Sequence, residues 1–235
     1  ETQESFPRWS PAGDRLTYMS LRDLDGDIYM QRSDGSGEAG VVANTDRGEF
    51  MPTWSPDGKY ITYHTYLNLE TKRDLWYIAV TGDRTSQAFK ATPANELQPV
   101  LSPDNQYAAY VSDASGQWEI YLTRFPSGEG RWQVSTDGGV YPIWNPRGGE
   151  LFYVEGSNDL MAVPITFGSE PEISRPQKLF SGEQVRAAQG YTGGIPAGGI
   201  YDVSIDGRSF VVVQDEDNGT VPMITVVQNW IREFE

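Results

Sequence analysis

The stretch MPTWSPDG, Met51–Gly58, sets the pattern of the whole chain because the sequence repeats it in varied form. Four further copies start elsewhere: FPRWSPAG at Phe6, QPVLSPDN at Gln98, YPIWNPRG at Tyr141 and the weaker YDVSIDG at Tyr201. The residues aligned just before Ser-Pro or its equivalent are separated by 45, 47, 43 and 59 residues: Trp9, Trp54, Leu101, Trp144 and Val203. A period of ~40–45 residues is typical of four-stranded propeller blades rather than of helical repeats. An insertion accounts for the longer last interval.

Each repeat contains the same order of strand-forming segments and turns. In the second repeat a strand ends in the motif, the turn PDGK follows from Pro56, and YITYHTY from Tyr60 and DLWYIAV from Asp74 form the next two strands. A shorter outer strand, QAFKA from Gln87, completes the unit. Tyr, Val, Ile, Trp and Phe dominate these runs, as expected of half-buried strands. Pro, Asp and Gly in the turn preset φ, cap backbone N–H groups or accept a positive φ.

We therefore predict an all-β fold, a β-propeller of four-stranded antiparallel blades with five recognisable repeats. The repeats are expected within a single domain, 1–235, at about residues 6–46, 51–92, 98–136, 141–180 and 200–230. No helix of useful length is predicted. The motif tryptophans and the paired tyrosines of the second strands should lie in or between the blades: Trp9, Trp54, Trp144, Tyr18, Tyr63, Tyr110 and Tyr153.

The two ends of the sequence leave one blade incomplete. Only IREFE follows Trp230, so the fifth repeat lacks a fourth strand, and the first repeat starts at Glu1, where a preceding outer strand should have ended. One terminus of a propeller usually completes the blade begun by the other. We therefore expect a part of a six-bladed or larger propeller, or a homodimer that pairs through the open blade edge.

The composition excludes several classes of partner. The 235 residues include 18 Lys+Arg and 33 Asp+Glu, a formal net charge of −15, and no cysteine. Such a field repels nucleic acid and anionic membranes and favours cationic partners. Because no run approaches the ~18 apolar residues of a membrane span, we expect no membrane insertion.

The pattern PxWSPDG…Y…DIY…DG resembles the repeats of TolB-like propellers, bacterial relatives of WD-repeat blades, over about residues 5–230. The resemblance implies a propeller of typically six blades that binds other proteins, and a periplasmic or extracellular location. Relatives also precede the hydrolase domain of prolyl-oligopeptidase-type peptidases, and one branch degrades pectin fragments. The family implies no shared catalytic residues, and a fold does not fix a function.

Glutamates recur three residues before the proline of the motif. Glu4, Glu49 and Glu96 hold this position, and the fourth repeat has Gly139 instead. Repetition should place the carboxylates at equivalent positions near the central channel. They would form an acidic collar for a cation or a basic peptide, or each would cap a backbone N–H of a neighbouring blade.

Irregular segments mark one face of the predicted propeller. The loops between second and third strands and the connections between blades share this loop-rich face, which includes Ser20–Gly26, Thr65–Arg73 and Ser181–Gly199. Loops that interrupt a repeat tend to carry its function. Besides the three glutamates, the candidate binding residues on this face are Tyr66, Arg73, Tyr141, Arg186 and Tyr191.

No catalytic, cofactor or metal site is predicted. His64 is the only histidine, and its alignment with core positions predicts a packed, hydrogen-bonded side chain. Asp23, Asp25 and Asp27 are spaced like calcium ligands, but the strand that follows favours a turn. The leading hypothesis is a non-enzymatic scaffold that binds a protein or peptide through the loop-rich face, alone or as the sensor part of a larger bacterial protein. The alternatives are a carbohydrate-active lyase or hydrolase with its site at the channel mouth, and an accessory propeller of a peptidase.

Overall fold

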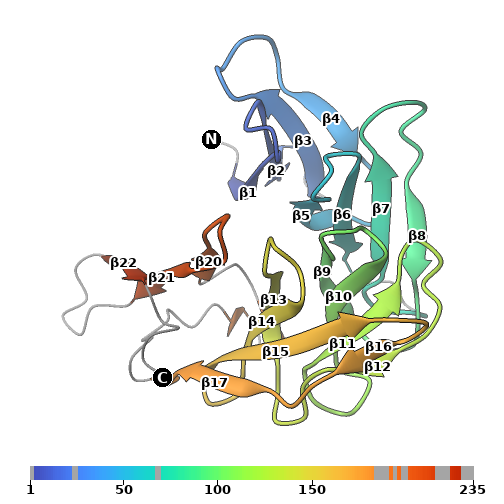
Figure 1. Ribbon diagram of the computed structural model, residues 1–235. Coiled ribbons are helices and arrows are strands. Elements are labelled where there is room, and N and C mark those ends of the chain that lie inside the picture. Colours follow the sequence, from blue (N-terminus) through green and yellow to red (C-terminus); the bar gives the residue numbers. More distant parts are fainter. Residues whose placement is uncertain are drawn as a thin grey trace. The chain divides into compact units, whose positions relative to one another are not determined.

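A computed structural model describes residues 3–22, 26–66, 70–182, 191–192, 195–196, 201–214 and 223–228, and it is all-β, as predicted (Figure 1). Its strands form antiparallel sheets, the blades of a β-propeller fold, in which three sheets have four strands in sequence order and one has five. In the part of the chain that the structure describes, no helix is long and apolar enough to cross a membrane. The chain divides into two compact units, Glu1–Gln117 with Tyr121–Arg131 and Trp118–Ile120 with Trp132–Glu235.

The first unit contains two complete sheets and most of a third. The strands of the first sheet are β1 (Glu4–Trp9), β2 (Arg15–Ser20), β3 (Asp27–Arg32) and β4 (Gly40–Ala43). Those of the second are β5 (Glu49–Trp54), β6 (Tyr60–Thr65), β7 (Leu75–Ala79) and β8 (Gln87–Lys90). The third sheet consists of β9 (Glu96–Leu101), β10 (Tyr107–Ser112), β11 (Glu119–Arg124) and β12 (Trp132–Gln133), and the division into units falls within it.

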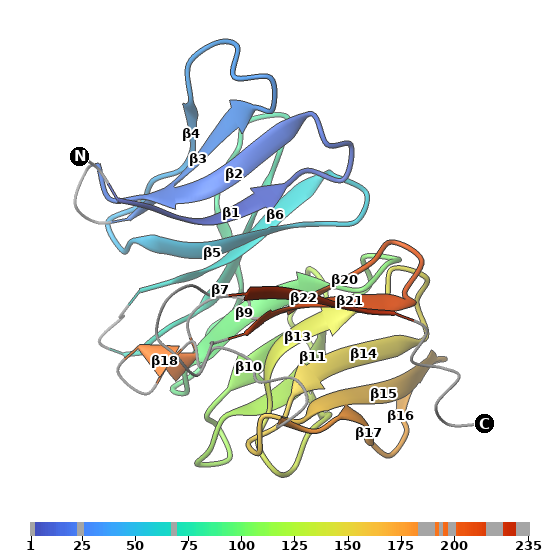
Figure 2. The same cartoon turned by 90° about the vertical axis from the view of Figure 1, so that its left-hand side faces the viewer.

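The second unit contains the remaining sheets. The fourth sheet consists of β13 (Val140–Trp144), β14 (Glu150–Val154), β15 (Leu160–Phe167) and β17 (Gln177–Phe180), and β16 (Pro171–Ile173) pairs with the end of β15 as an unpredicted extra hairpin. The fifth sheet has β20 (Tyr201–Val203), β21 (Ser209–Gln214) and β22 (Met223–Gln228). A short hairpin, β18 (Tyr191–Thr192) and β19 (Ile195–Pro196), precedes it (Figure 2).

The Ser-Pro-Asp-Gly turn owes its repetition to a local hydrogen-bond network. In the second sheet the Ser55 hydroxyl donates to Asp57 Oδ1 at 2.8 Å and accepts the Tyr60 N–H at 2.9 Å. Asp57 Oδ1 also accepts the Lys59 N–H at 3.1 Å, and Gly58 has a φ of 71°. The same serine–aspartate bond closes the turns at Ser102 and Ser204.

Each inner strand of the first four sheets contains a bulge before its proline. The residue before proline has a positive φ of 53–57° at Phe6, Met51, Gln98 and Tyr141. The register with the second strand shifts at the same point. A bulge bends the strand and redirects its side chains, so the first residues of the inner strand face a different environment from the rest.

The core of the first unit lies between consecutive sheets. Ile28, Ala43, Trp54, Ile61 and Tyr63 form one buried cluster, in which the Trp54 indole N–H donates to Thr17 Oγ1 at 3.0 Å. A second cluster between the second and third sheets includes the edge-to-face rings of Tyr77, Phe89 and Phe125.

The second unit has an aromatic core of its own. Phe152 and Phe210 pack edge to face, with ring centroids 4.9 Å apart, and Trp144 and Tyr153 are buried. The predicted burial of the repeated aromatic residues is therefore confirmed for Trp54, Trp144 and the tyrosines 63, 110 and 153. It is wrong for Trp9, whose side chain is 61% exposed.

Candidate functional site

The loop-rich end of the second sheet gathers several of the predicted residues. Glu49 at the start of β5 pairs in register with Thr65 at the end of β6, and the Thr65 N–H donates to the Asp74 carbonyl before β7. Glu96 and Ser112 pair in the same way at the start of β9 and the end of β10. The strand directions thus bring the glutamates and the irregular loops to one end of their sheets.

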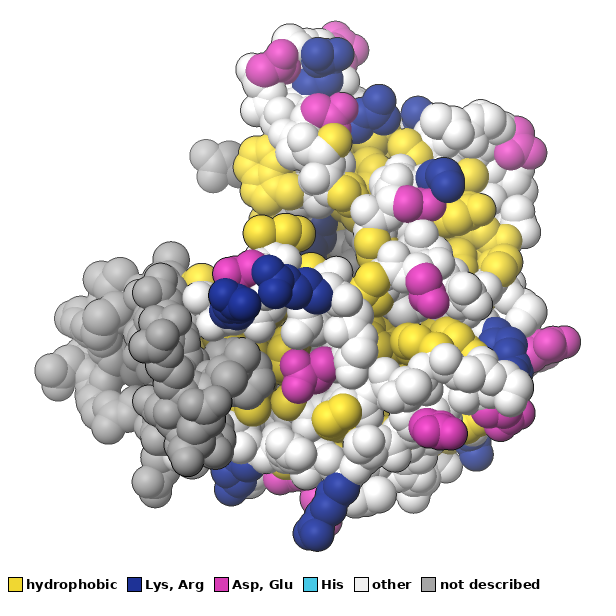
Figure 3. Space-filling model, viewed as in Figure 1, with side chains coloured by type: hydrophobic (Ala, Val, Ile, Leu, Met, Phe, Trp, Pro, Cys, Tyr) yellow, Lys and Arg dark blue, Asp and Glu magenta, His cyan; other side chains and the backbone are white. Residues whose placement is uncertain are grey.

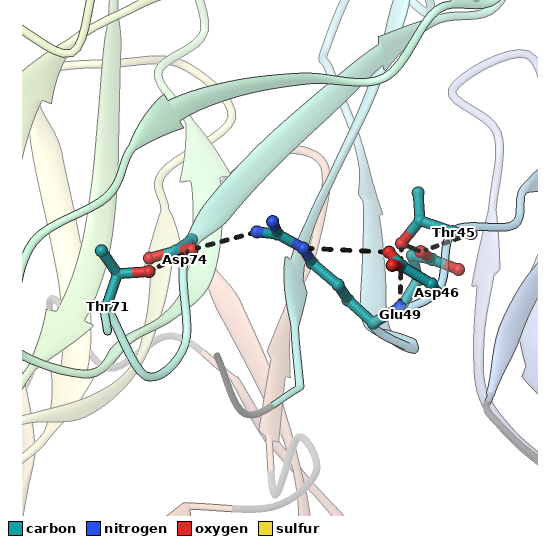
Figure 4. A network of polar contacts seen from close by, with 6 residues as sticks. Thr45, Asp46, Glu49, Thr71 and Asp74 are labelled. Carbon is teal, nitrogen blue, oxygen red and sulfur yellow. Dashed lines mark hydrogen bonds and ion pairs between the residues drawn. The ribbon is translucent and has the colours of Figure 1, made fainter. Parts of the chain in front are cut away.

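Glu49 and Glu96 are buried, with exposed fractions of 0% and 2%. Oε1 of Glu49 accepts the Thr45 N–H at 3.0 Å and the Thr45 hydroxyl (Figure 4), and Oε1 of Glu96 accepts the Thr92 hydroxyl. Among the residues that the structure describes, neither Oε2 has a hydrogen-bond partner. Each carboxyl group therefore binds the loop before its own strand, and neither is exposed as a collar of carboxylates would be.

Burial raises the pKa of both glutamates. The pKa of Glu49 and that of Glu96 rise from 4.5 to about 7, chiefly because desolvation disfavours the ionised form. A neighbouring negative charge adds to the shift, that of Asp27 for Glu49 and that of Asp74 for Glu96. The bonds from Thr45 and Thr92 oppose it.

Glu4 does not share this environment. Its exposed carboxylate accepts the Ser20 hydroxyl at 3.1 Å and Arg22 Nη2 at 3.0 Å. Two of the three equivalent glutamates, Glu49 and Glu96, therefore share the same kind of buried environment, whereas Glu4 in the first repeat does not.

At the junction between the third and fourth repeats, the buried carboxylate comes from a different strand. Gly139 replaces the glutamate, and Glu119 at the start of β11 accepts the Ser135 hydroxyl on Oε2 and the Gly138 N–H on Oε1 at 3.1 Å. Ser135 precedes Gly139 by four residues, as Thr45 precedes Glu49. Sequence reasoning missed Glu119, although the signal was present: a glutamate where the first and second repeats have Asp27 and Asp74.

An aromatic and cationic array lies beside the buried glutamates. The Phe50 ring stacks on His64, with ring centroids 6.1 Å apart, and is tilted against Tyr66, with ring centroids 5.4 Å apart. The Arg73 guanidinium lies 5.0 Å from the centre of the Tyr66 ring. Arg73 Nη1 donates to Asn95 Oδ1 at 3.2 Å, and the Asn95 side chain donates to Asp113 at 2.7 Å. Tyr66 is 52% exposed, so the hydrogen-bonded residues hold the array in place while the Tyr66 ring remains accessible to a partner.

Arg47 links two acidic residues on the same end of the sheet, and sequence reasoning did not identify it. Its guanidinium lies 3.9 Å from Asp46 Oδ1 through Nε and 3.9 Å from Asp74 Oδ2 through Nη1. Thr71 Oγ1 donates to the same Asp74 oxygen at 2.8 Å, and the guanidinium also lies 5.7 Å from the Trp76 ring. The contacts fix the loop Thr45–Glu49 against the start of β7.

His64 is a core residue, as predicted. It is 6% exposed, and burial together with the Arg73 charge lowers its pKa to about 3, so the imidazole is neutral. The predicted hydrogen bond is not found for Nδ1, which has no partner within the described ranges.

The remaining candidates lie in other parts of the sequence. Tyr141 is buried, and its carbonyl accepts the Tyr201 hydroxyl at 2.8 Å. Arg186, Asp23 and Asp25 lie outside the described residues, and Tyr191 lies in β18.

Charge on the surface is mixed. Figure 3 shows Lys and Arg side chains interspersed with Asp and Glu on the face that it draws, without a large area of one sign. In the described ranges, no three His, Cys, Asp or Glu side chains are grouped as metal ligands.

Comparison with known proteins identifies the repeat. Residues 4–177 match the model of the family described as TolB beta propeller domain. No curated protein matches the sequence.

Solved structures share the fold at low sequence identity. TolB from Acinetobacter baumannii is similar with a TM-score of 0.70 and 16% identity, over 98% of this chain and 53% of that protein. A puromycin-hydrolyzing peptidase from Mycobacterium tuberculosis has a TM-score of 0.62 and 15% identity, over 97% of this chain and 36% of the peptidase. An oligogalacturonate lyase in complex with manganese has a TM-score of 0.59 and 13% identity, over 98% and 76%. The chain thus spans about half the length of the similar TolB structure.

Proposed function

The chain belongs to the TolB β-propeller domain family, and we propose that it is a non-enzymatic scaffold that binds a protein or peptide through its loop-rich face. The observation that carries the proposal is the array of Phe50, Tyr66 and Arg73. We place this activity in the periplasm or outside the cell, in line with the TolB resemblance.

The array has the features of a preorganised binding anchor. Phe50 supports one side of the Tyr66 ring, and the Tyr66 N–H donates to the Gly48 carbonyl at 2.9 Å, so little freedom is lost on binding. Asn95 fixes Arg73 in turn, and Asp113 fixes Asn95. Tyr and Arg are enriched among the residues that dominate binding energies at interfaces.

The chemistry of the array selects the kind of segment that it can hold. The exposed Tyr66 ring offers a stacking surface to an apolar or aromatic side chain. A guanidinium carries five N–H donors in a planar fork, so Arg73 can donate to a carboxylate or a backbone carbonyl while it remains bonded to Asn95. With a net charge of −15, the protein favours a segment whose remaining charge is neutral or basic.

A random peptide library displayed on phage tests the proposal, with selection on the wild-type chain and counter-selection on Tyr66→Ala. Peptides that survive should bind the wild-type chain in isothermal titration. They should bind Tyr66→Ala and Arg73→Gln at least about tenfold more weakly, a loss of about 1.4 kcal/mol. Oligogalacturonates titrated in the same way test the carbohydrate-active alternative.

Two exposed residues outside the array provide matched controls. Ile205→Ala removes an apolar side chain that is 86% exposed, and Arg32→Gln removes an exposed arginine at the end of β3. Both variants should bind the selected peptides like the wild-type chain. If library selection yields no binder, or if binders tolerate Tyr66→Ala and Arg73→Gln as well as the controls, the proposed site is wrong.

A further inference from the structure

The buried glutamates Glu49 and Glu96 sit in equivalent places that each contain a second acidic residue. Glu49 lies beside Gly26, whose carbonyl accepts the Glu49 N–H at 2.6 Å, and Gly26 directly precedes Asp27. Glu96 lies beside Arg73, whose carbonyl accepts the Glu96 N–H at 2.9 Å, and Arg73 directly precedes Asp74. The first residue of one inner strand therefore bonds, through its N–H, to the residue before the aspartate at the entry to the third strand of the preceding sheet.

The hydrogen bonds around these glutamates are unevenly distributed. One oxygen of each, Oε1, accepts from Thr45 or Thr92. The other oxygen, Oε2, is buried and has no hydrogen-bond partner in the described part of the chain. A buried carboxylate oxygen with no donor is costly, whereas a protonated oxygen is itself a donor and needs only an acceptor.

The charges that face each glutamate are mostly negative. Asp27 and Asp46 act on Glu49, and the buried Tyr63 hydroxyl is near it. Asp74 acts on Glu96 in the same sense, the Lys90 ammonium acts against it, and Tyr110 is its neighbour from β10. The Arg47 guanidinium lies 3.9 Å from both Asp46 and Asp74, so its charge is engaged by these two aspartates.

We propose that Glu49 and Glu96 are proton-binding sites: each holds a proton on Oε2 and shares it with the aspartate across the junction, Asp27 and Asp74 respectively. One negative charge per pair then remains in a place that is closed to water. The aspartates are already fixed to receive such a bond, because Asn44 donates to Asp27 at 3.1 Å and Thr71 donates to Asp74 at 2.8 Å.

The third copy of this arrangement is a natural comparison within the same chain. Gly139 removes the glutamate, and the remaining Glu119 has both oxygens bonded, to Ser135 and to the Gly138 N–H. Where a single acidic residue occupies the place, each of its oxygens has a donor. Where two occupy it, one oxygen is left without one, which is the pattern that a bound proton accounts for.

Release of the proton should loosen the loop-rich face. A second charge beside Asp27 or Asp74 in a dry environment is relieved if the segment before the inner strand moves toward water. The segments affected, 43–49 and 91–96, carry Arg47 and Asn95, and Asn95 positions Arg73. The protein would thus respond to pH near neutrality on the face proposed to bind a partner, although proton binding does not depend on that function.

Titration of the wild-type protein tests the proposal directly. With glutamate side-chain carboxyls labelled with ¹³C, two signals should titrate with midpoints near 7, well above the ordinary 4.5. Glu49→Gln should remove one of these signals and Glu96→Gln the other. Glu119→Gln, the matched control, should remove a different signal and leave both midpoints in place.

Amide hydrogen exchange provides the second measurement. After correction for the intrinsic effect of pH, protection of residues 43–49 and 91–96 should fall about tenfold in the wild-type protein as pH rises through 7. It should stay constant in the Glu49→Gln Glu96→Gln double variant, because glutamine mimics the protonated acid. The proposal is overturned if every glutamate titrates near 4.5, since a buried water rather than a proton would then satisfy Oε2.

Discussion

In the two compact units, equivalent spaces between consecutive sheets are filled by carboxyl groups from different strands. In the first, Glu49 and Glu96 reach into the space from the inner strand, opposite Asp27 and Asp74. In the second, Glu119 reaches into the equivalent space from the third strand, and Gly139 leaves room for it. The hydroxyl that donates to the carboxyl group comes from the same position in each repeat: Thr45, Thr92 and Ser135.

The difference shows that the repeat preserves a filled space and a hydrogen-bonded carboxyl group, not a residue at a fixed position. Asp27 with Glu49 places two acidic groups in the space, whereas Glu119 with Gly139 places one. The number of acidic groups then decides whether the site binds a proton. Each prediction below tests how far this comparison extends.

The largest effect is expected from Gly139→Glu, which would give the second unit the inner-strand residue of the first. A Cβ at position 139 would collide with Ser135 Oγ and Ile120 Cγ1, and a second carboxyl group would face Glu119. Overpacking and a buried like-charge pair together should destabilise the fold by more than about 3 kcal/mol. Chemical denaturation monitored by tryptophan fluorescence measures the loss.

A second substitution separates the two causes. Gly139→Glu combined with Glu119→Asp recreates the Asp/Glu pair of the first unit and shortens the side chain that competes for the space. The double variant should recover part of the lost stability. If it is as unstable as Gly139→Glu alone, the equivalence of the two spaces is wrong.

The next largest effect is the pH dependence of stability. For Glu49 and Glu96 the folded-state pKa of about 7 lies above the unfolded value of 4.5, so their contribution is fully present below pH 4.5. It is lost as pH rises through about 7, by up to about 3 kcal/mol per site. The free energy of unfolding of the wild-type protein should therefore fall relative to the Glu49→Gln Glu96→Gln variant across this range. Urea titrations at a series of pH values measure the difference.

The prediction would be contradicted if the free energy of unfolding changed with pH in the same way for the wild-type protein and the double variant. Glu119→Gln again serves as the control, because the new amide nitrogen cannot accept the hydrogen bond that Ser135 or Gly138 donates to Glu119. It should therefore lower the stability without removing the difference between the wild-type protein and the double variant.

The fold was predictable from the sequence because its turns are closed by hydrogen bonds between residues close in the chain. The site was less predictable because it depends on packing between distant segments. The turn at Ser55–Gly58 is closed by bonds between residues at most five apart, so its signature is visible in the sequence. The surroundings of Glu49 include the nearby Thr45 but also Asp27 and Tyr63 in other strands. A repeated glutamate therefore revealed the position without its environment.

The stacking array illustrates the same limit. Tyr66 and Arg73 were predicted as binding residues from their irregular loop. The supporting residues Phe50, Asn95 and Asp113 come from three other segments, and nothing in their local sequence joins them.

Another repeated position extends the comparison with a smaller effect. Trp54 is 9% exposed and its indole donates to Thr17, whereas Trp9 is 61% exposed. Trp54→Phe should therefore cost about 1–2 kcal/mol through the lost hydrogen bond and packing. Trp9→Phe should change the free energy of unfolding by less than about 0.5 kcal/mol. Equal costs in denaturant titrations would show that Trp9 is covered in solution.

The smallest effect compares the turns that follow the motif in the two units. Asp57 accepts the Ser55 hydroxyl and the Lys59 N–H, whereas Arg147 holds the same position in the fourth repeat, where its N–H donates to Asn145 Oδ1 at 3.0 Å. Asp57→Ala should cost about 1 kcal/mol at neutral pH, because two hydrogen bonds lose their acceptor. Arg147→Ala should cost less than about 0.5 kcal/mol, because the bond uses its backbone.

Measuring the same stabilities at low pH separates the contribution of the Asp57 charge from that of the turn geometry. Partial burial raises the pKa of Asp57, but the hydrogen bonds from Lys59 and Ser55 outweigh it and hold the pKa below 3.8. A lowered pKa stabilises the folded state above pH 3.8, and this contribution disappears as pH falls through the folded-state value. The difference between wild type and Asp57→Ala should therefore shrink in strong acid, while that for Arg147→Ala stays flat. A difference that persists in acid would assign the role of Asp57 to turn geometry rather than to its charge.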